Sequence, residues 1–228
     1  MKSILGAVLI FLFIRHFLVE AFRIPSGSMI PTLLVGDWLF VNKAVYGPHV
    51  PFTDIALPGY AEPSRGEVVV FESPPQMDQP WDPTPTLVKR LVAVPGDTIH
   101  MRGGLFHVNG VPKPQPPEAA RNRVGDGGET SPLFAWQHDH ELRETRFGPP
   151  PSQPTHDDWG PLLVPPTRYF MLGDNRYDSK DGRYWGLVPR ENLRGRPLFI
   201  YYSWNAESER PLAFLTEIRW DRIGHRIR

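Results

Sequence analysis

Proline and glycine recur so closely along this chain that short strands and turns are favoured over long helices. The 228 residues include 27 prolines and 20 glycines, and both residues are unfavourable inside helices. Between them lie short runs rich in β-branched and aromatic residues, which favour strands. These runs are residues 37–43, 66–72, 86–94, 168–172 and 197–204. The sequence therefore predicts a mostly β protein.

Overall composition excludes several kinds of chemistry. Lys plus Arg and Asp plus Glu balance at 25 each, so no net charge points to a nucleic-acid partner. The chain has no cysteine, which excludes disulfides, thiolate catalysis and cysteine-based zinc sites. Its length allows one large domain or two small ones, with a buried core.

The N-terminal residues form an apolar stretch that no later part of the chain matches. As a helix, Ser3–Phe22 would span about 30 Å, the thickness of a bilayer core. Lys2 biases the N-terminal side toward the cytoplasm, which places the rest of the chain outside. A cleaved signal peptide ending near residues 19–21 is the alternative, although Glu20 and Phe22 flank a poor cleavage point. We predict a single transmembrane anchor over residues 1–22.

Two segments lack the periodic apolar residues of strands. Residues 74–86 are predicted to form a long loop, and residues 112–166 are polar and rich in proline. The second segment predicts a partly irregular insertion between two halves of one β core, residues 23–111 and 167–228. The insertion carries no motif that indicates its role.

Ser28 is a candidate nucleophile. It follows Gly27, which allows close backbone approach, but a serine hydroxyl needs a base that removes its proton. His138 and His140 lie in the predicted insertion without an H-E-x-x-H motif, so a zinc hydrolase is poorly supported. No G-x-S-x-G motif is present either. A Ser-His triad stays open, although nothing selects its histidine.

Lys89 is the better candidate for the base. In a strand over residues 86–94 it shares one face with Leu87 and Leu91, while Arg90 faces the other side. Burial among apolar side chains destabilises an ammonium ion and lowers its pKa, as a lysine general base requires. The alternative is a lysine that reaches solvent at a strand end.

A third segment, GDNRYDSKDGRYWG at residues 173–186, mixes opposite charges with glycine. A calcium loop does not fit, because Tyr177 would occupy the first ligand position and Val188 would replace the bidentate glutamate. The charges instead predict ion pairs that fix a loop, in which Ser179 could orient a neighbouring amine. The charged side chains in question are Asp174, Arg176, Asp178, Asp181 and Arg183.

Four segments in order resemble the motif set of the bacterial type I signal peptidases, which are membrane-bound serine peptidases with a serine-lysine dyad. They are PSGSMIPTL (25–33), GDWLFVNK (36–43), VKRLVAVPGDTI (88–99) and GDNRYDSKDGRYWGLVP (173–189). The C-terminal RWDRIGHRIR is also similar to the family's ending. The resemblance covers the anchor, both halves of the β core and the tail.

This resemblance implies a role for each matching residue. Ser28 is the expected nucleophile and Lys89 its general base. Ser26 is the expected side-chain donor to the oxyanion, beside the backbone N–H of Ser28, and Ser179 positions the lysine. A supporting ion pair is expected between Asp174 and Arg183. Shallow pockets for small substrate side chains are expected from Phe22, Ile24, Met29, Leu33 and Val88.

The implied protein is an endopeptidase that removes signal peptides from exported pre-proteins after small residues. Its expected fold is a mostly antiparallel β core with a smaller β extension inserted in it. No metal or cofactor is needed, and the expected partners are signal peptides and phospholipid, not nucleic acid. We expect a monomer in the bacterial inner membrane, with its catalytic domain on the periplasmic face. Two alternatives stay open: an inactive membrane-anchored module that binds peptides, and a specialised relative that processes one secretion or conjugation substrate.

Overall fold

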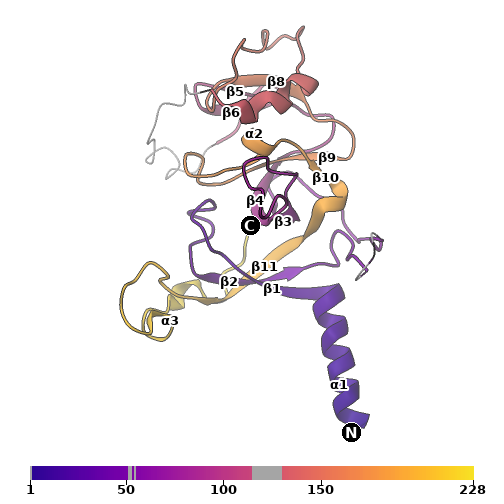
Figure 1. Ribbon diagram of the computed structural model, residues 1–228, viewed down its shortest axis with the longest axis vertical. Coiled ribbons are helices and arrows are strands. Elements are labelled where there is room, and N and C mark those ends of the chain that lie inside the picture. Colours follow the sequence, from indigo (N-terminus) through magenta and orange to yellow (C-terminus); the bar gives the residue numbers. More distant parts are fainter. Residues whose placement is uncertain (1, 51–52, 54, 115–129) are drawn as a thin grey trace.

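Two antiparallel sheets make up the protein, as shown in a computed structural model that describes residues 2–50, 53, 55–114 and 130–228 (Figure 1). The larger sheet has seven strands in the order β1-β2-β11-β3-β4-β9-β10, and the smaller has four in the order β7-β6-β5-β8. All the strand pairs in these two sheets are antiparallel. The prediction of a mostly β fold is confirmed.

The strands of the larger sheet are drawn from most of the chain. They are β1 Val19–Arg23, β2 Asp37–Asn42, β3 Val68–Glu72, β4 Thr86–Ala93, β9 Arg168–Leu172, β10 Val188–Pro189 and β11 Leu193–Ser203. The smaller sheet contains β5 Thr98–Arg102, β6 Leu105–Val108, β7 Val111–Pro112 and β8 Trp159–Leu163. The helices are α1 Lys2–Phe13, the π-helix η1 Ile14–Leu18, η3 Pro132–His140, α2 Gly182–Trp185, η4 Arg190–Asn192, α3 Ala213–Thr216 and η5 Trp220–Arg222.

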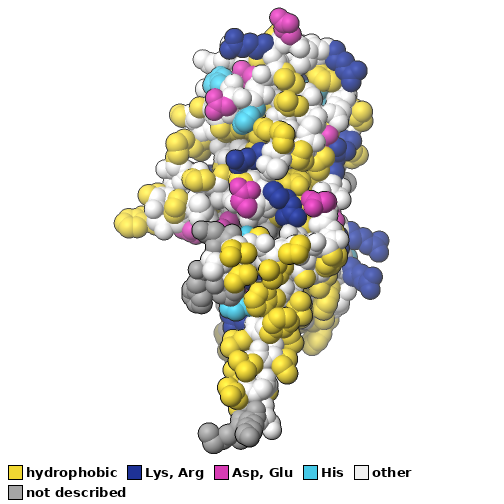
Figure 2. Space-filling model, turned by 90° about the vertical axis from the view of Figure 1, so that its right-hand side faces the viewer, with side chains coloured by type: hydrophobic (Ala, Val, Ile, Leu, Met, Phe, Trp, Pro, Cys, Tyr) yellow, Lys and Arg dark blue, Asp and Glu magenta, His cyan; other side chains and the backbone are white. Residues whose placement is uncertain are grey.

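The N-terminal helix ends earlier than the sequence predicts. The chain leaves η1 at Leu18 and enters β1, which pairs with β2 from Val19↔Asn42 to Arg23↔Trp38. The predicted helix over residues 3–22 is therefore wrong for its last four residues, because their backbone groups bond to a neighbouring strand. Among the described residues, no helix combines the length and the apolar character that crossing a membrane requires. Most large apolar side chains of α1 are exposed, and Figure 2 shows hydrophobic side chains gathered toward that end of the molecule.

The smaller sheet begins before the insertion predicted at residues 112–166. Residues 98–111, which we assigned to the catalytic core, form β5 and β6 and pair in the smaller sheet. The sheet also contains β8, which lies near the end of the predicted insertion and pairs with β5. A hairpin has the same alternating pattern whichever sheet it joins, so the sequence pattern alone does not say which sheet residues 98–111 enter.

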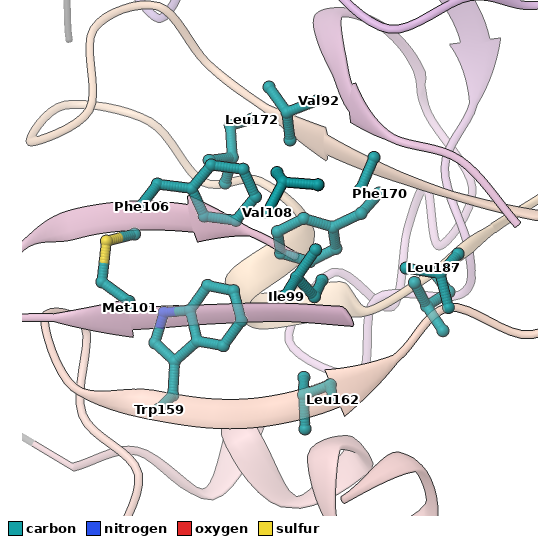
Figure 3. Close-up of a cluster of buried hydrophobic side chains, with 12 residues drawn as sticks. Val92, Ile99, Met101, Phe106, Val108, Trp159, Leu162, Phe170, Leu172 and Leu187 are labelled. Atoms are coloured by element: carbon teal, nitrogen blue, oxygen red, sulfur yellow. The ribbon is translucent and has the colours of Figure 1, made fainter. Parts of the chain in front are cut away.

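Strands β4 and β9 link the two sheets, because side chains on their opposite faces pack into different hydrophobic clusters. Phe170 and Leu172 point into a cluster with Phe106 and Trp159 of the smaller sheet (Figure 3). The alternate residues of β9, Tyr169 and Met171, pack on the other side, in a cluster that contains Leu91, Phe71 and Trp185. A third cluster, around Leu39 and Val70, lies under the segment after β1. Both strands that lead to the site are therefore held from two sides.

Candidate active site

Ser28 lies in a loop whose two ends are fixed in the sheet. The N–H of Ile24 donates to the carbonyl of Asp37 at 2.8 Å, and the N–H of Gly36 donates back to Ile24 at 3.0 Å. Within the loop, the side chains of Met29 and Leu33 are fully buried in the third cluster. Because the residue after Ser28 is anchored in the core, the half-buried serine has a defined position.

Lys89 meets Ser28 across 61 residues of sequence. Its Nζ lies 2.6 Å from Ser28 Oγ, within hydrogen-bond distance. The lysine side chain is only 3% exposed. Burial lowers the pKa of Lys89 to about 8, with Arg183 adding to the shift and Asp181 opposing it. The structure thus joins the two residues that the sequence singled out, and it buries the lysine instead of leaving it at a solvated strand end.

The loop after β9 closes against Ser28. The carbonyl of Ser28 accepts a hydrogen bond from the N–H of Asn175 at 3.1 Å, and the carbonyl of Gly27 accepts one from Asn175 Nδ2 at 3.2 Å. A Cβ on Gly173 would lie 2.5 Å from the carbonyl oxygen of Ser28 and 2.1 Å from Ser179 Oγ. Glycine is therefore required at this position for the two loops to touch. Asn175 was not singled out from the sequence.

Ser179 and Ser26 have hydroxyl groups without partners among the described residues. Ser179 Oγ is buried beside Gly173 and Ser28, which leaves its hydroxyl free to orient a group in the site. Ser26 is exposed two residues before Ser28. Their predicted roles, in lysine positioning and oxyanion binding, stay predictions.

The ion pair predicted between Asp174 and Arg183 does not form. Asp174 binds Arg90 through two contacts, Nε–Oδ1 at 2.7 Å and Nη2–Oδ2 at 2.6 Å, and also accepts from Thr32 Oγ1 at 2.5 Å. Arg183 binds Asp181 through two contacts of 2.8 Å. The prediction is wrong because Arg90, on the opposite face of β4 from Lys89, reaches Asp174, while Asp181 caps the helix that carries Arg183.

Arg183 is the centre of a buried hydrogen-bond network that includes His156 from the insertion. It donates to the carbonyl of Arg176 at 2.6 Å and contacts His156 Nε2. Asp181 in turn accepts from the N–H of Gly173 at 2.9 Å. Burial and Arg183 lower the pKa of His156, while Asp157 hydrogen-bonds Nδ1 at 2.7 Å. The network favours a neutral His156. The sequence missed this residue because the insertion around it has no motif.

The predicted pocket residues lie together but are less open than expected. Ile24, Met29 and Leu33 are fully buried, and Phe22 and Val88 pack on them while half-buried.

Near these residues, one edge of strand β4 is unpaired. Its pairing with β9 starts at Arg90, so residues 86–89 have no strand partner on that side among the described residues.

The histidines of QHDH lie away from this constellation, on η3. His138 pairs with Glu141 at 3.1 Å. In the part of the chain that the structure describes, no cluster of acidic and histidine side chains is arranged to hold a metal ion. The site therefore consists of a serine and a buried amine, held by two loops.

Comparison with known proteins identifies the class of enzyme. The family model described as "Signal peptidase, peptidase S26" matches residues 1–204. The chain belongs to this family and is a serine endopeptidase. This confirms the resemblance seen in the sequence motifs, and the family is associated with bacterial membranes.

Named relatives agree with the family match. The chain is 36% identical over 217 residues to signal peptidase I of Pseudomonas fluorescens, covering 89% of this chain and 72% of that protein. It is 33% identical over 232 residues to signal peptidase I of Aquifex aeolicus, covering 90% and 84%. The crystal structure of a signal peptidase I from Enterococcus faecalis is 26% identical, covers 59% of this chain and 96% of that one, and has a TM-score of 0.39, too low to support an argument about fold.

Proposed function

We propose that this chain is a type I signal peptidase that uses Ser28 as its nucleophile and Lys89 as its general base. The removal of signal peptides from exported pre-proteins follows from the family, and the residue roles follow from the site. The contact between Lys89 Nζ and Ser28 Oγ at 2.6 Å carries the proposal, because the lysine is buried and its pKa is about 8. At that pKa, a useful fraction of the amine is neutral near physiological pH.

In each of the two halves of the reaction, one proton passes through the amine of Lys89. The neutral amine of Lys89 takes the proton of Ser28, and Oγ attacks the carbonyl carbon of the scissile bond. The resulting ammonium gives its proton to the leaving amine, which departs as the mature protein's N-terminus. The same amine then takes a proton from a water molecule that attacks the ester carbonyl; the C–Oγ bond breaks, the signal peptide leaves as a carboxylic acid, and the ammonium returns its proton to Ser28 Oγ. In this proposal the backbone N–H of Ser28 and the Ser26 hydroxyl stabilise the oxyanion.

The free edge of β4 is the proposed binding site for the substrate backbone. An extended peptide adds to an open strand edge through main-chain hydrogen bonds, with alternate side chains in pockets. Residues 86–89, which include Lys89, supply that edge. Ile24, Met29 and Leu33 would then form the pocket floor, with Phe22 and Val88 at the rim. Such a floor leaves room for alanine or glycine but not for a large side chain.

The signal peptide is proposed to approach from the side of α1. A cavity of about 710 Å³ is lined by His16 of η1, Phe22 of β1 and Thr86 of β4. It therefore extends from the end of the N-terminal helical segment to Thr86, the first residue of β4. We further propose that the exposed apolar side chains of α1 anchor the chain in the bacterial inner membrane in a single pass, with the catalytic domain outside. Alkaline carbonate extraction should leave the full chain in the membrane fraction.

A cleavage assay in detergent tests the function. The full chain should cut a pre-protein with alanine before the scissile bond and fail on the same pre-protein with phenylalanine there. Ser28→Ala should abolish cleavage. Ser26→Ala should lower kcat by about a hundredfold with little change in KM, because it removes a donor to the developing charge. Equal rates for the alanine and phenylalanine substrates would contradict the proposal.

Two alternative functions give different results in that assay. An inactive peptide-binding module would cleave nothing, and the contact between a buried lysine and a serine argues against it. A specialised relative would cleave one pre-protein of a panel and leave the others intact.

A further inference from the structure

A second, smaller cavity is lined by Lys180, the residue that follows Ser179. Its volume is about 150 Å³, and three segments enclose it: residues 75–78 before β4, the start of η3 in the insertion, and Lys180 with α2. Apolar and aromatic side chains make up much of its wall, including Met77, Leu133, Trp136, Tyr184 and Trp185. A dry apolar cavity of about this size can hold a benzene-sized group, so one large apolar side chain would fit.

Two residues of this wall are themselves nearly buried, Gln76 at 4% and Trp185 at 7% exposed. Gln76 Nε2 donates to Ser73 Oγ at 3.0 Å, which holds its side chain in place. This part of the wall is therefore fixed by the protein itself.

Two segments of the cavity wall are close in sequence to residues of the site. Lys180 follows Ser179 directly, and residues 75–78 belong to the loop that leads into β4 and Lys89. An ion pair between Lys180 Nζ and Asp78 Oδ1 at 2.5 Å joins these two segments. In Figure 1, α2 lies on the side of β3 and β4 that faces away from α1. The larger cavity, which we assign to the signal peptide, is on the α1 side.

We propose that this cavity binds an apolar side chain from the mature part of the pre-protein, within the first few residues after the cut. The inference rests on the proposed function, because it assumes that Ser28 and Lys89 mark the scissile bond. A substrate whose signal segment lies toward α1 would extend past the site on the opposite side, where α2 and the cavity lie. The insertion thereby gains a role in substrate selection through Leu133, Ala135 and Trp136.

Quenched peptides with a fixed signal side provide the test. Each has alanine before the cut and carries leucine, glycine or aspartate at one of the first few positions after it. For the wild-type chain we expect kcat/KM to favour leucine over glycine by about tenfold or more at one position, as apolar pockets typically discriminate. Ala135→Trp, which fills the cavity, should remove that preference, so that the leucine and glycine peptides are cut at similar kcat/KM. Asp139→Trp, an exposed position on the same helix η3 outside the cavity wall, should keep the preference.

The outcomes separate the two proposals. Cleavage of all peptides at equal rates by the wild-type chain would overturn the cavity assignment and leave the peptidase intact. A leucine preference that survives in Ala135→Trp would also overturn it, provided that circular dichroism shows a native fold. If no peptide or pre-protein is cut, both proposals fail.

Discussion

At the scale of single residues, the site depends on a lysine placed where a strand would ordinarily bury an apolar side chain. Lys89 faces the cluster that contains Val69, Phe71 and Leu91. Removing water from an ammonium ion is costly, so the neutral amine is favoured. Asp181 partly opposes this effect, but burial is the larger cause and the pKa falls to about 8.

The pH dependence of cleavage should report this pKa. The amine is active when neutral, so activity should rise with pH through about 8. Lys89→Arg keeps the charge but cannot lose its proton, so the variant should fold and lose more than about a hundredfold of the rate. The control variant Lys113→Arg changes a lysine just after β7 of the smaller sheet, and it should keep the wild-type dependence of cleavage rate on pH. A rate for Lys89→Arg within tenfold of wild type would contradict the dyad.

At the scale of elements, the site is a contact between two loops that follow different strands. The loop after β1 carries Ser28, and the loop after β9 carries Ser179. They meet at Gly173, where neither side leaves room for a Cβ. Two hydrogen bonds fix the second loop: Asp181 accepts from the N–H of Gly173, and Arg183 donates to the carbonyl of Arg176.

Gly173→Ala should therefore separate the loops without unfolding the sheets. The added methyl group would meet the backbone oxygen of Ser28, which is held by Asn175 and cannot give way as a flexible side chain would. We expect kcat to fall by about a hundredfold or more, as small misplacements of reacting groups do, with a near-native thermal transition. Gly6→Ala in α1, where a Cβ meets nothing within 4 Å, is the matched control. Unchanged activity in Gly173→Ala would show that the loop contact is not needed.

At the scale of the whole molecule, the C-terminal segment fixes the loop that carries Ser28. Arg222 binds buried Asp37 through contacts of 3.0 and 2.6 Å and donates to the carbonyl of Thr32 at 3.1 Å. Ser203 Oγ also donates to Asp37 at 2.7 Å. The end of the chain thus closes over residues 32–37, far from it in sequence.

Breaking this buried pair should cost stability. Arg222→Ala leaves the Asp37 carboxylate buried without its partner, which typically costs about 3–5 kcal/mol. Urea unfolding should show a lower midpoint with a similar slope. Arg210→Ala removes an arginine whose side chain is 77% exposed and which pairs with Glu217, and it should change the free energy of unfolding by less than about 1 kcal/mol. Equal effects of the two variants would show that the C-terminal contact adds no stability.

The sequence by itself determined the local features of this protein. Alternating apolar residues between Pro and Gly placed most of the larger sheet's strands, including β2, β4 and β9, within a few residues. The face of β4 that carries Lys89 also followed from strand periodicity, because that pattern depends only on neighbouring residues. The motif segments then pointed to Ser28 as its partner.

Only the tertiary structure decided which distant groups meet. Arg90 reaches Asp174 across 84 residues, and His156 reaches Arg183 from an insertion without a motif. The end of η1 at Leu18 and the assignment of residues 98–111 to the smaller sheet also depended on pairing with remote strands. Charge and apolar patterns indicate which kind of partner a side chain can bind. Several residues of the chain could be that partner, and the strand pairing of the sheets decides which of them lies close enough.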